Sequence, residues 1–211
     1  MTLFRLDASI LPPTSASAEL ADVIEAKWTA AHPGERIVRR HLGTDPLPAD
    51  VWALAATAPF VPEADRPQAQ VDALAVAQGL RAQLTAADAV LLAVPLYNYG
   101  VSQHFKTWVD LVVAGGDAAE QVLKGKPTVL ATVRGGGYGP GTPREGWDHS
   151  TPYLRRILAD MWGADLTIVE RELTLVGVNP ALDHLQDLGA ELRAQALEDA
   201  DKVGTDFAAA G

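Results

Sequence analysis

Three loops contain the residue types that can bind a phosphorylated, ring-bearing ligand. The first, residues 9–17, reads Ser-Ile-Leu-Pro-Pro-Thr-Ser-Ala-Ser and stands directly before a segment of helical periodicity. A helix start offers unpaired N–H groups and the positive end of the helix dipole, so hydroxyls and backbone can hold a phosphate without a basic side chain. Ordinary helix capping by Ser15 or Ser17 explains the same residues. Taken alone, this loop leaves both interpretations open.

The second loop, residues 95–101, reads Pro-Leu-Tyr-Asn-Tyr-Gly-Val and follows an uninterrupted apolar run. Two aromatic residues flank an amide residue in this loop, with Pro95 restricting the backbone before them and Gly100 allowing it to turn after them. Such a loop can present a flat surface and backbone donors to a heteroaromatic ring. Alternatively, Tyr97 and Tyr99 cap the edge of a sheet while Asn98 forms a turn.

The third loop, residues 133–141, reads Val-Arg-Gly-Gly-Gly-Tyr-Gly-Pro-Gly. Consecutive glycines let the backbone approach a ligand closely and direct its N–H groups at carbonyl oxygens. Arg134 is expected to add a fixed positive charge there. A mobile surface loop is the alternative, because flexible segments are also rich in glycine.

Several other chemistries lack their motifs. The chain has no phosphate-binding loop of the G-x-x-x-x-G-K-[ST] type, no G-x-G-x-x-G after the first apolar run and no G-x-S-x-G elbow. It has no cysteine, which excludes thiolate nucleophiles and Cys-ligated metals. His149 and His184 each follow an aspartate, but no second ligand stands at metal-binding spacing. We therefore expect no metal and no catalytic side chain.

Composition restricts the partners. The 211 residues include 17 basic and 27 acidic side chains, a net charge of −10 without a basic cluster, which argues against nucleic-acid and anionic-membrane surfaces. No apolar stretch reaches the roughly 18 residues of a membrane span, and the first residues resemble neither a signal nor a transit peptide. We expect one cytoplasmic domain, residues 1–211.

The elements that must position these loops follow from hydrophobic patterning. Strands are predicted at residues 3–6, 35–41, 89–94, 127–133 and 166–169, with a further strand segment at 173–176. Helices are predicted at residues 17–31 with Ser17 as N-cap, 48–58, 71–84, 102–114, 153–162 and 180–207. The last helix is expected to be solvated apart from one apolar stripe, Leu185, Leu188, Leu192 and Leu197.

Alternation of these strands and helices predicts an α/β fold, a five-stranded parallel sheet with helices on both faces. Ligands of such sheets bind beyond the carboxyl ends of the strands, where strand order reverses. The three unusual loops directly follow the first, third and fourth predicted strands, so all three are expected at this edge of the sheet. Their shared position is the main evidence from the residues themselves for one ligand site.

These motifs resemble the FMN-dependent NADH-azoreductase family, flavodoxin-like NAD(P)H:quinone and azo oxidoreductases. The first loop resembles the family's phosphate loop, residues 95–99 resemble its Pro-Met-Tyr-Asn-Phe, and residues 132–136 resemble its Ser-Arg-Gly-Gly turn. Residues 105–110 and 151–154 match two further family segments. By this resemblance the FMN-binding residues are Ser9, Ser15, Ala16, Ser17, Pro95, Leu96, Tyr97, Asn98, Tyr99, Val133, Arg134, Gly135 and Gly136.

The resemblance implies a homodimer with a ping-pong cycle, in which NADH or NADPH reduces FMN and a small-molecule acceptor, a quinone or an azo compound, is then reduced. Two alternatives stay open. One is a flavodoxin-like electron carrier or flavin-binding module without a small-molecule acceptor. The other is a biosynthetic relative with one dedicated substrate, suggested because residues 115–123 are shorter than in the family and lack its aromatics.

Overall fold

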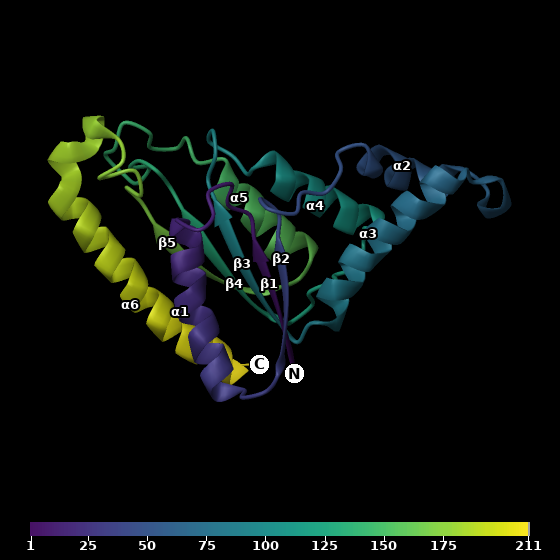
Figure 1. The fold of residues 1–211 in the computed structure, drawn as a ribbon, viewed down its shortest axis with the longest axis horizontal. Coiled ribbons are helices and arrows are strands. Elements are labelled where there is room, and N and C mark those ends of the chain that lie inside the picture. Colours follow the sequence, from purple (N-terminus) through teal and green to yellow (C-terminus); the bar gives the residue numbers. More distant parts are fainter. Residues whose placement is uncertain (211) are drawn as a thin grey trace.

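Five strands form one parallel sheet in the computed structural model, which describes residues 1–210. They are β1 (Thr2–Asp7), β2 (Arg36–His41), β3 (Ala89–Pro95), β4 (Pro127–Val133) and β5 (Asp165–Arg171). Their spatial order is β2-β1-β3-β4-β5 (Figure 1), so strand order reverses between β1 and β3. Central β3 is buried along its whole length, which explains its uninterrupted apolar sequence. The predicted five-stranded parallel sheet is confirmed.

Helices cover both faces of this sheet, as predicted (Figure 1). One face carries α1 (Ala16–Ala31) and α6 (Gln186–Ala210). The other carries α3 (Gln68–Ala86), α4 (Gln103–Ala114), α5 (Ser150–Arg155) and its π-helical continuation η3 (Arg156–Met161). The remaining helices are α2 (Val51–Thr57), η1 (Ala58–Phe60), η2 (Glu63–Asp65) and η4 (Pro180–Leu185).

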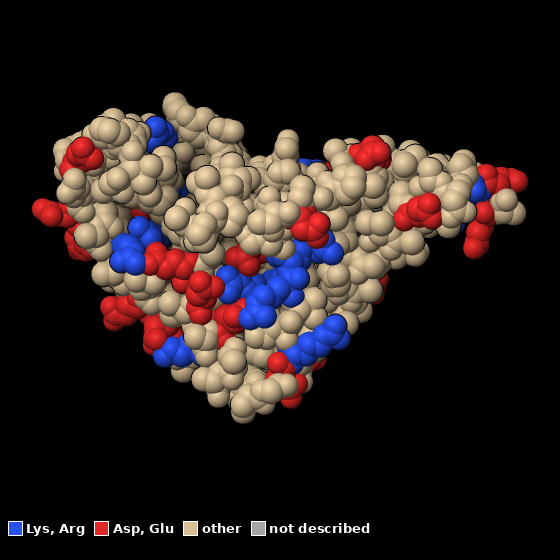
Figure 2. Space-filling view, viewed as in Figure 1, with Lys and Arg blue, Asp and Glu red and all other residues tan. Residues whose placement is uncertain are grey.

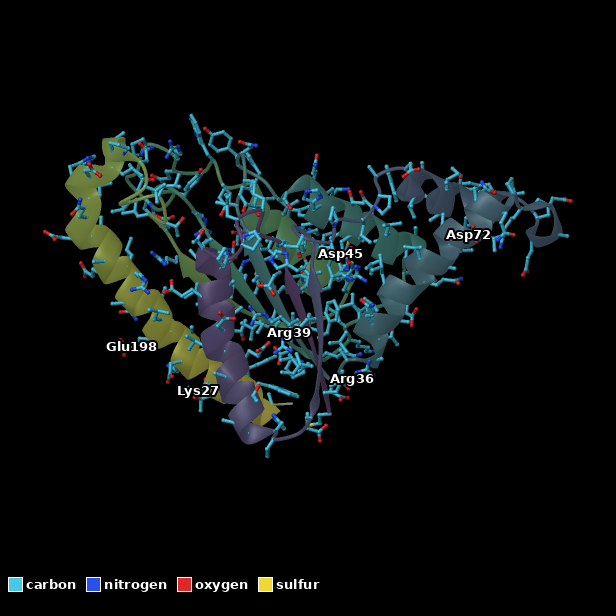
Figure 3. All side chains as sticks on the ribbon, in the orientation of Figure 1. Lys27, Arg36, Arg39, Asp45, Asp72 and Glu198 are labelled. Atoms are coloured by element: carbon cyan, nitrogen blue, oxygen red, sulfur yellow. The ribbon has the colours of Figure 1, made fainter. Side chains whose placement is uncertain are left out.

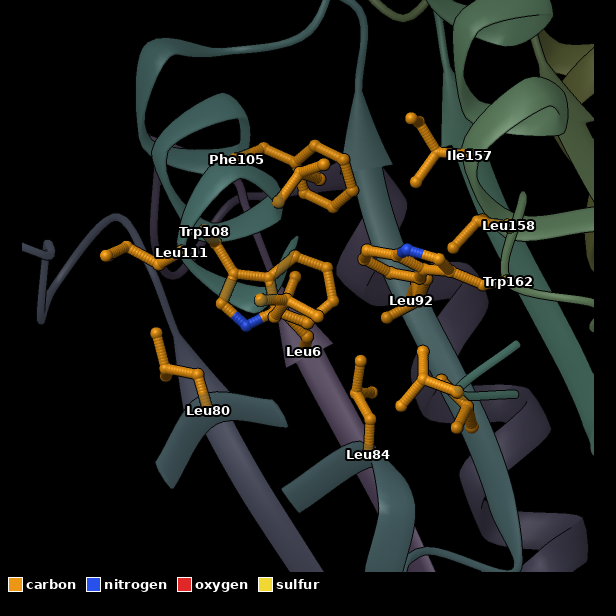
Figure 4. Packing of buried hydrophobic residues seen from close by; sticks show 14 of the residues in the cluster. Leu6, Leu80, Leu84, Leu92, Phe105, Trp108, Leu111, Ile157, Leu158 and Trp162 are labelled. Atoms are coloured by element: carbon orange, nitrogen blue, oxygen red, sulfur yellow. The ribbon is translucent and has the colours of Figure 1, made fainter. Parts of the chain in front are cut away.

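The two faces have different cores because side chains alternate along each strand. Phe4 of β1 points toward α4 and stacks on Trp108 with ring centroids 6.3 Å apart, whereas neighbouring Leu3 packs under α1. Trp108 also meets Phe105 and, edge-on, Trp162, so aromatic rings fill the space between α4 and η3 (Figure 4). This packing fixes the start of α4 and therefore the loop that follows β3.

Edge strand β2 carries basic side chains that are locally neutralised. Figure 2 shows Lys and Arg gathered in the middle of one face, with acidic side chains beside them. Arg39 lies along β2 (Figure 3), and its Nη2 is 2.7 Å from Glu25 Oε1 of α1. Charges on an edge strand also disfavour pairing with a further strand.

Two predicted elements differ in the structure. Helix α1 starts at Ala16, and its N-cap is Ser15 rather than Ser17: Ser15 Oγ accepts a hydrogen bond from the N–H of Ala18 at 3.2 Å. Residues 173–176 form turns and not a strand, because Leu173 has a φ of +57° and its N–H bonds back to the carbonyl of Gly136. The chain thus folds around the glycine-rich turn instead of extending the sheet.

The predicted last helix, residues 180–207, is in fact two helices, η4 and α6. The face of α6 that packs on the protein consists mostly of small residues, Gly189, Ala196, Ala200, Gly204, Phe207 and Ala208. A Cβ at Gly204 would lie 3.0 Å from the Cα of Ile24, so the helices α1 and α6 approach closely there. Lys27 of α1 (Figure 3) ties them further through a 2.6 Å ion pair to Asp201.

The predicted leucine stripe therefore divides. Of its four members only Leu197 packs against the core beneath α1 and α6. Leu185, Leu188 and Leu192 line an open groove instead. Within residues 1–210 no helix combines the length and the apolar character that crossing a bilayer requires.

Candidate functional site

A cavity of about 320 Å³ opens at the carboxyl edge of the sheet, where the three predicted loops meet. The loop after β1 contributes hydroxyl and backbone groups, and the loops after β3 and β4 contribute apolar and aromatic walls. The lining residues are Ser9, Leu11, Thr14, Ser15, Ala16, Pro95, Leu96, Tyr97, Val133, Gly135, Thr174, Leu175 and Val178. Loops far apart in the sequence thus form one site beside the switch point of the sheet.

Eight of the thirteen site residues predicted from the sequence line this cavity: Ser9, Ser15, Ala16, Pro95, Leu96, Tyr97, Val133 and Gly135. The other five lie next to it without lining it: Ser17, Asn98, Tyr99, Arg134 and Gly136. Their positions in the structure show what each can contribute.

The start of α1 forms one end of the cavity. Within the part of the chain that the structure describes, the N–H groups of Ala16 and Ser17 have no hydrogen-bond acceptor. The Ser17 side chain is fully buried, and its Oγ is 3.1 Å from Ser15 Oγ, so Ser17 can offer a ligand its backbone but not its hydroxyl. Free N–H groups at the positive end of a 16-residue helix favour an anion.

Tyr97 connects the first loop to the second. Its hydroxyl accepts a hydrogen bond from the N–H of Ile10 at 3.1 Å and lies 3.3 Å from Ser9 Oγ. The backbones of Tyr97 and Gly100 exchange two hydrogen bonds of 2.9 Å, closing a tight turn over Asn98 and Tyr99.

This turn holds two non-glycine residues in the left-handed region, Asn98 at φ +47° and Tyr99 at φ +68°. Such conformations cost roughly 1 kcal/mol or more per residue and persist where the surroundings impose them. Both residues are exposed, and their N–H groups have no acceptor within residues 1–210. The turn therefore projects two backbone donors beyond the sheet.

Arg134 was predicted to add a fixed positive charge at the ligand, and the structure shows its guanidinium buried in the protein and paired with carboxylates. Arg134 Nε is 2.6 Å from Asp148 Oδ2, Nη1 is 3.2 Å from Glu170 Oε2, and Nη2 donates to Thr151 Oγ1 at 3.0 Å. Burial disfavours the charged form, but Glu170 and Asp148 outweigh it and raise the pKa of Arg134. Arg134 braces the third loop from behind.

Asp148 completes this brace and was not predicted. Burial alone would raise its pKa, but hydrogen bonds from the backbone and hydroxyl of Thr151, together with Arg134, hold the pKa below its ordinary value. Asp148 Oδ1 also accepts from the N–H groups of Ser150 and Thr151 at 2.8 and 2.9 Å, at the start of α5. An aspartate just before a helix start was the available sequence signal.

The loop after β5 supplies a wall that sequence reasoning missed. The N–H of Thr174 donates to the carbonyl of Arg134 and that of Leu175 to the carbonyl of Gly135, both at 3.1 Å. A Cβ at Gly135 would lie 2.7 Å from Leu175 Cδ1, so a side chain at this position would require Leu175 to move. No local pattern indicated this contact, because residues 173–176 were predicted as a strand.

Gly43, after β2, is a second position that was missed. A side chain at this residue would collide with the carbonyl oxygen of Ser9. Because Gly43 has no Cβ, the loop after β2 can pack directly against the backbone of the first loop at Ser9. An isolated glycine directly after a strand was the only sequence signal.

The guanidinium groups of Arg171 and Arg193 lie beyond the end of the cavity that the start of α1 forms. They line an open polar hollow together with Thr14 and Ser15. Arg171 Nη1 is 3.0 Å from Glu19 Oε2, and Arg193 also pairs with Glu19. Burial lowers the pKa of Arg171, with Arg193 adding to this effect and Glu19 opposing it. Glu19 thus neutralises part of the positive charge near the helix start.

The arrangement suits a ligand with an anionic end and a flat apolar body. Uncommitted N–H groups and the hydroxyl of Thr14 stand at one end of the cavity, and Pro95, Leu96 and Val133 form its apolar walls. Within residues 1–210, no three His, Asp or Glu side chains gather in a way that could hold a metal ion.

Comparisons with known proteins agree with this geometry. Residues 1–199 match the model of a family described as having a flavodoxin-like fold. The chain is 38% identical to an FMN-dependent NADH:quinone oxidoreductase of Frankia casuarinae, covering 92% of this chain and 94% of the relative. It is 37% identical to the protein of the same name in Streptomyces avermitilis, covering 94% and 93%.

A crystal structure of an azoreductase from Bacillus anthracis superposes with a TM-score of 0.80, covering 98% of this chain and all of that one. At 23% sequence identity, this likeness supports the fold. In a sheet of this topology, the cavity lies beyond the carboxyl ends of the strands beside the switch point, where ligands of such sheets bind.

Proposed function

The chain belongs to the flavodoxin-like family of FMN-dependent NADH:quinone oxidoreductases, and from this premise we propose that it uses FMN to reduce quinones and azo compounds with NADH or NADPH. The observation that carries the proposal is the single cavity lined by Ala16, Tyr97 and Gly135, which places the start of α1 and its free N–H groups at one end and an aromatic and a glycine-rich loop at the other. A phosphate at one end and a ring at the other fit that order of groups.

In this proposal the start of α1 holds the FMN phosphate. Ser15 caps the helix, while Thr14 and the N–H groups of Ala16 and Ser17 provide uncharged donors. The backbone donors of the turn at Asn98 and Tyr99 and of the Gly135–Gly136 turn serve the polar edge of the ring. Pro95, Leu96, Tyr97 and Val133 form its apolar surroundings.

FMN, when bound, supplies the redox chemistry by taking a hydride from the nicotinamide and then delivering two electrons to the acceptor, in ping-pong order. For a quinone, the net reaction consumes NADH and a proton and yields NAD⁺ and the hydroquinone. The protein orients the ring and leaves one side of the cavity open. No side chain needs to act as an acid or base, since solvent reaches the site.

We propose further that the enzyme is a cytoplasmic homodimer. The support is an arm formed by α2, η1 and the start of α3, which projects away from the sheet (Figure 1). This arm exposes Trp52 and Phe60, the latter with 84% of its surface in solvent. Exposed aromatic side chains on a projecting element are typical of protein interfaces.

Steady-state NADH oxidation with a soluble quinone tests the proposal. The FMN-loaded protein is expected to turn over many equivalents of NADH, with parallel double-reciprocal lines when both substrates are varied. NADPH in place of NADH measures donor preference, and an azo compound in place of the quinone measures acceptor range. Reduction of bound FMN by NADH without turnover of any soluble acceptor would instead indicate an electron carrier.

A further inference from the structure

A second and larger cavity lies beside the FMN cleft. It has a volume of about 670 Å³ and runs between the loop of residues 137–147 and the start of α6. We call it the leucine groove, after Leu182, Leu185, Leu188 and Leu192, which form its helical wall. Cavities of this size and apolar character commonly bind small molecules.

The leucines of this groove are incompletely covered in the described chain: Leu188 is exposed, and Leu182, Leu185 and Leu192 are half-buried. The second half of α6 is packed on α1 through glycine and alanine, whereas the first half presents leucines at helical spacing to the groove. Leu188 is 46% exposed, and Trp147 on the opposite wall is 50% exposed. Apolar side chains gathered around an open cavity mark a binding surface, since leaving them in water is unfavourable.

The groove adjoins the FMN cleft: no residue of the described chain lines both, but Tyr99, Gly137 and Leu173 of the groove neighbour residues of the cleft wall. Tyr99, from the turn at the ring end of the cleft, forms part of the groove wall and lies edge-on to Trp147 at 5.5 Å between ring centroids. Gly137, the neighbour of the glycines at the cleft, is also part of the groove wall. A molecule that extends from the ring end of the cleft past Tyr99 would reach the groove.

Charge is distributed unevenly along the groove. At the cleft end, the guanidinium of Arg144 lies against Gly136 and 5.8 Å from the centre of the Tyr138 ring. Arg134 is held by Asp148 and Glu170, but no carboxylate in the described chain forms an ion pair with Arg144. Glu172, which accepts a hydrogen bond from the N–H of Tyr138, also lines the groove, so its cleft end holds one guanidinium and one carboxylate, while its α6 side is apolar.

We propose that the leucine groove binds the isoprenoid tail of a lipophilic quinone whose head lies at the ring end of the FMN cleft. This inference rests on the proposed function and specifies its acceptor. The oxygens of a quinone head can accept hydrogen bonds from the Arg144 guanidinium at the cleft end, and a hydrocarbon tail matches the leucines. A compact quinone would fill the cleft and leave the groove empty.

The test compares a methylnaphthoquinone without a tail with the same head carrying a geranyl tail, in NADH-driven turnover. The KM of the tailed quinone is expected to be at least about tenfold lower, since each buried methylene adds to affinity. Leu188→Glu should bring the ratio of the two KM values to about one, and Leu188→Ala should lower it partially. Val76→Glu, at an exposed apolar position of α3, is the matched control and should leave the ratio unchanged.

Binding without turnover gives an independent readout. Trp147 lines the groove, so the geranyl quinone should quench tryptophan fluorescence saturably in the absence of NADH, and Trp147→Phe should remove most of that signal. The tailless quinone should quench weakly at the same concentrations. Repeating the titration at several protein concentrations shows whether a second copy of the chain covers the groove instead.

The outcomes separate the two proposals. Absence of FMN binding, or of turnover with either quinone, would overturn the proposed function. Turnover with equal KM values for both quinones, or a tail preference that Leu188→Glu leaves intact, would overturn the groove assignment alone. Quenching that appears only in dilute protein would assign the groove to the dimer interface and contradict the tail site.

Discussion

The two ends of the FMN cleft are built differently. At the end assigned to the phosphate, the backbone donors of the helix start are uncommitted: the N–H groups of Ala16, which lines the cavity, and of its neighbour Ser17 have no acceptor within residues 1–210. At the ring end, the positive charge of Arg134 is not available to a ligand. Arg134 lies next to Gly135 in the chain, and its guanidinium forms ion pairs with Asp148 and Glu170. One end of the cleft thus offers free hydrogen-bond donors, whereas at the other end an internal ion-pair network supports the loop that forms the wall.

This difference explains how a chain with a net charge of −10 can hold a phosphate. Backbone donors and a helix dipole act locally and need no basic side chain. The buried arginine stabilises the shape of the loop after β4, so that its glycines stay close to the ring. Under the proposed assignment, the charge of Arg134 has a structural role at the ring end, and backbone N–H groups would bind the ligand at the phosphate end.

Breaking the brace should have the largest effect. Arg134→Met leaves Asp148 buried without its cation, and removing one partner of a buried ion pair typically costs about 3–5 kcal/mol. We expect a loss of that order in the free energy of unfolding, measured by urea denaturation. Arg156→Met, which removes an exposed pair with Asp160, should cost less than about 1 kcal/mol. Equal costs for both variants would show that Arg134 is not a brace.

The same pair predicts an acid-dependent stability. The pKa of Asp148 is held below its ordinary value of 3.8 in the folded state, so its contribution is complete above that value and is lost as the pH falls through the lower folded pKa. Urea unfolding between neutral pH and about pH 2 should show this decline. Asp148→Asn should flatten its part of the acid limb; an unchanged acid limb would assign the decline to other carboxylates.

The phosphate end should respond most clearly at Ser15. Ser15→Ala removes the N-cap of α1 and a hydroxyl on the cavity wall, so FMN should bind about tenfold more weakly while riboflavin, which lacks the phosphate, loses less than about twofold. Ser17→Ala is the matched control, because its buried hydroxyl does not face the cavity, and it should change FMN affinity by less than about twofold. The reverse order would place the Ser17 side chain on the phosphate.

The smallest effect is expected where the two loops are joined. Tyr97→Phe keeps the ring but removes the hydroxyl that contacts Ser9 and Ile10, a loss of about 1 kcal/mol for one hydrogen bond. FMN and riboflavin should weaken equally, by a few-fold, because both use the ring end. Titration of tryptophan or flavin fluorescence measures both affinities. A loss confined to FMN would mean that Tyr97 acts on the phosphate end.

Much of the fold and the position of the cleft were predictable, because they depend on local patterns. The apolar run of β3, the Pro and Gly residues after it, and the hydroxyls before α1 all mark their elements in sequence. The N-cap was misplaced by two residues, since Ser15 and Ser17 are both suitable and only the backbone geometry decides between them.

Long-range contacts were not predictable. The orientation of Arg134 depends on carboxylates 14 and 36 residues away, and no local pattern reveals which of the 27 acidic residues will approach it. The contact of Leu175 with Gly135 likewise joins two loops that are separate in sequence. The leucine stripe of the last helix was read correctly as apolar, but periodicity could not show that part of it faces an open groove.

A titration of the purified protein with FMN, followed by visible absorbance and anaerobic addition of NADH, tests the central claim most directly. The account predicts saturable binding of one FMN per chain, far tighter than that of riboflavin, and bleaching of the bound flavin by NADH. Failure to bind FMN at any concentration, or equal affinity for FMN and riboflavin, would contradict the assignment of the α1 start as the phosphate site.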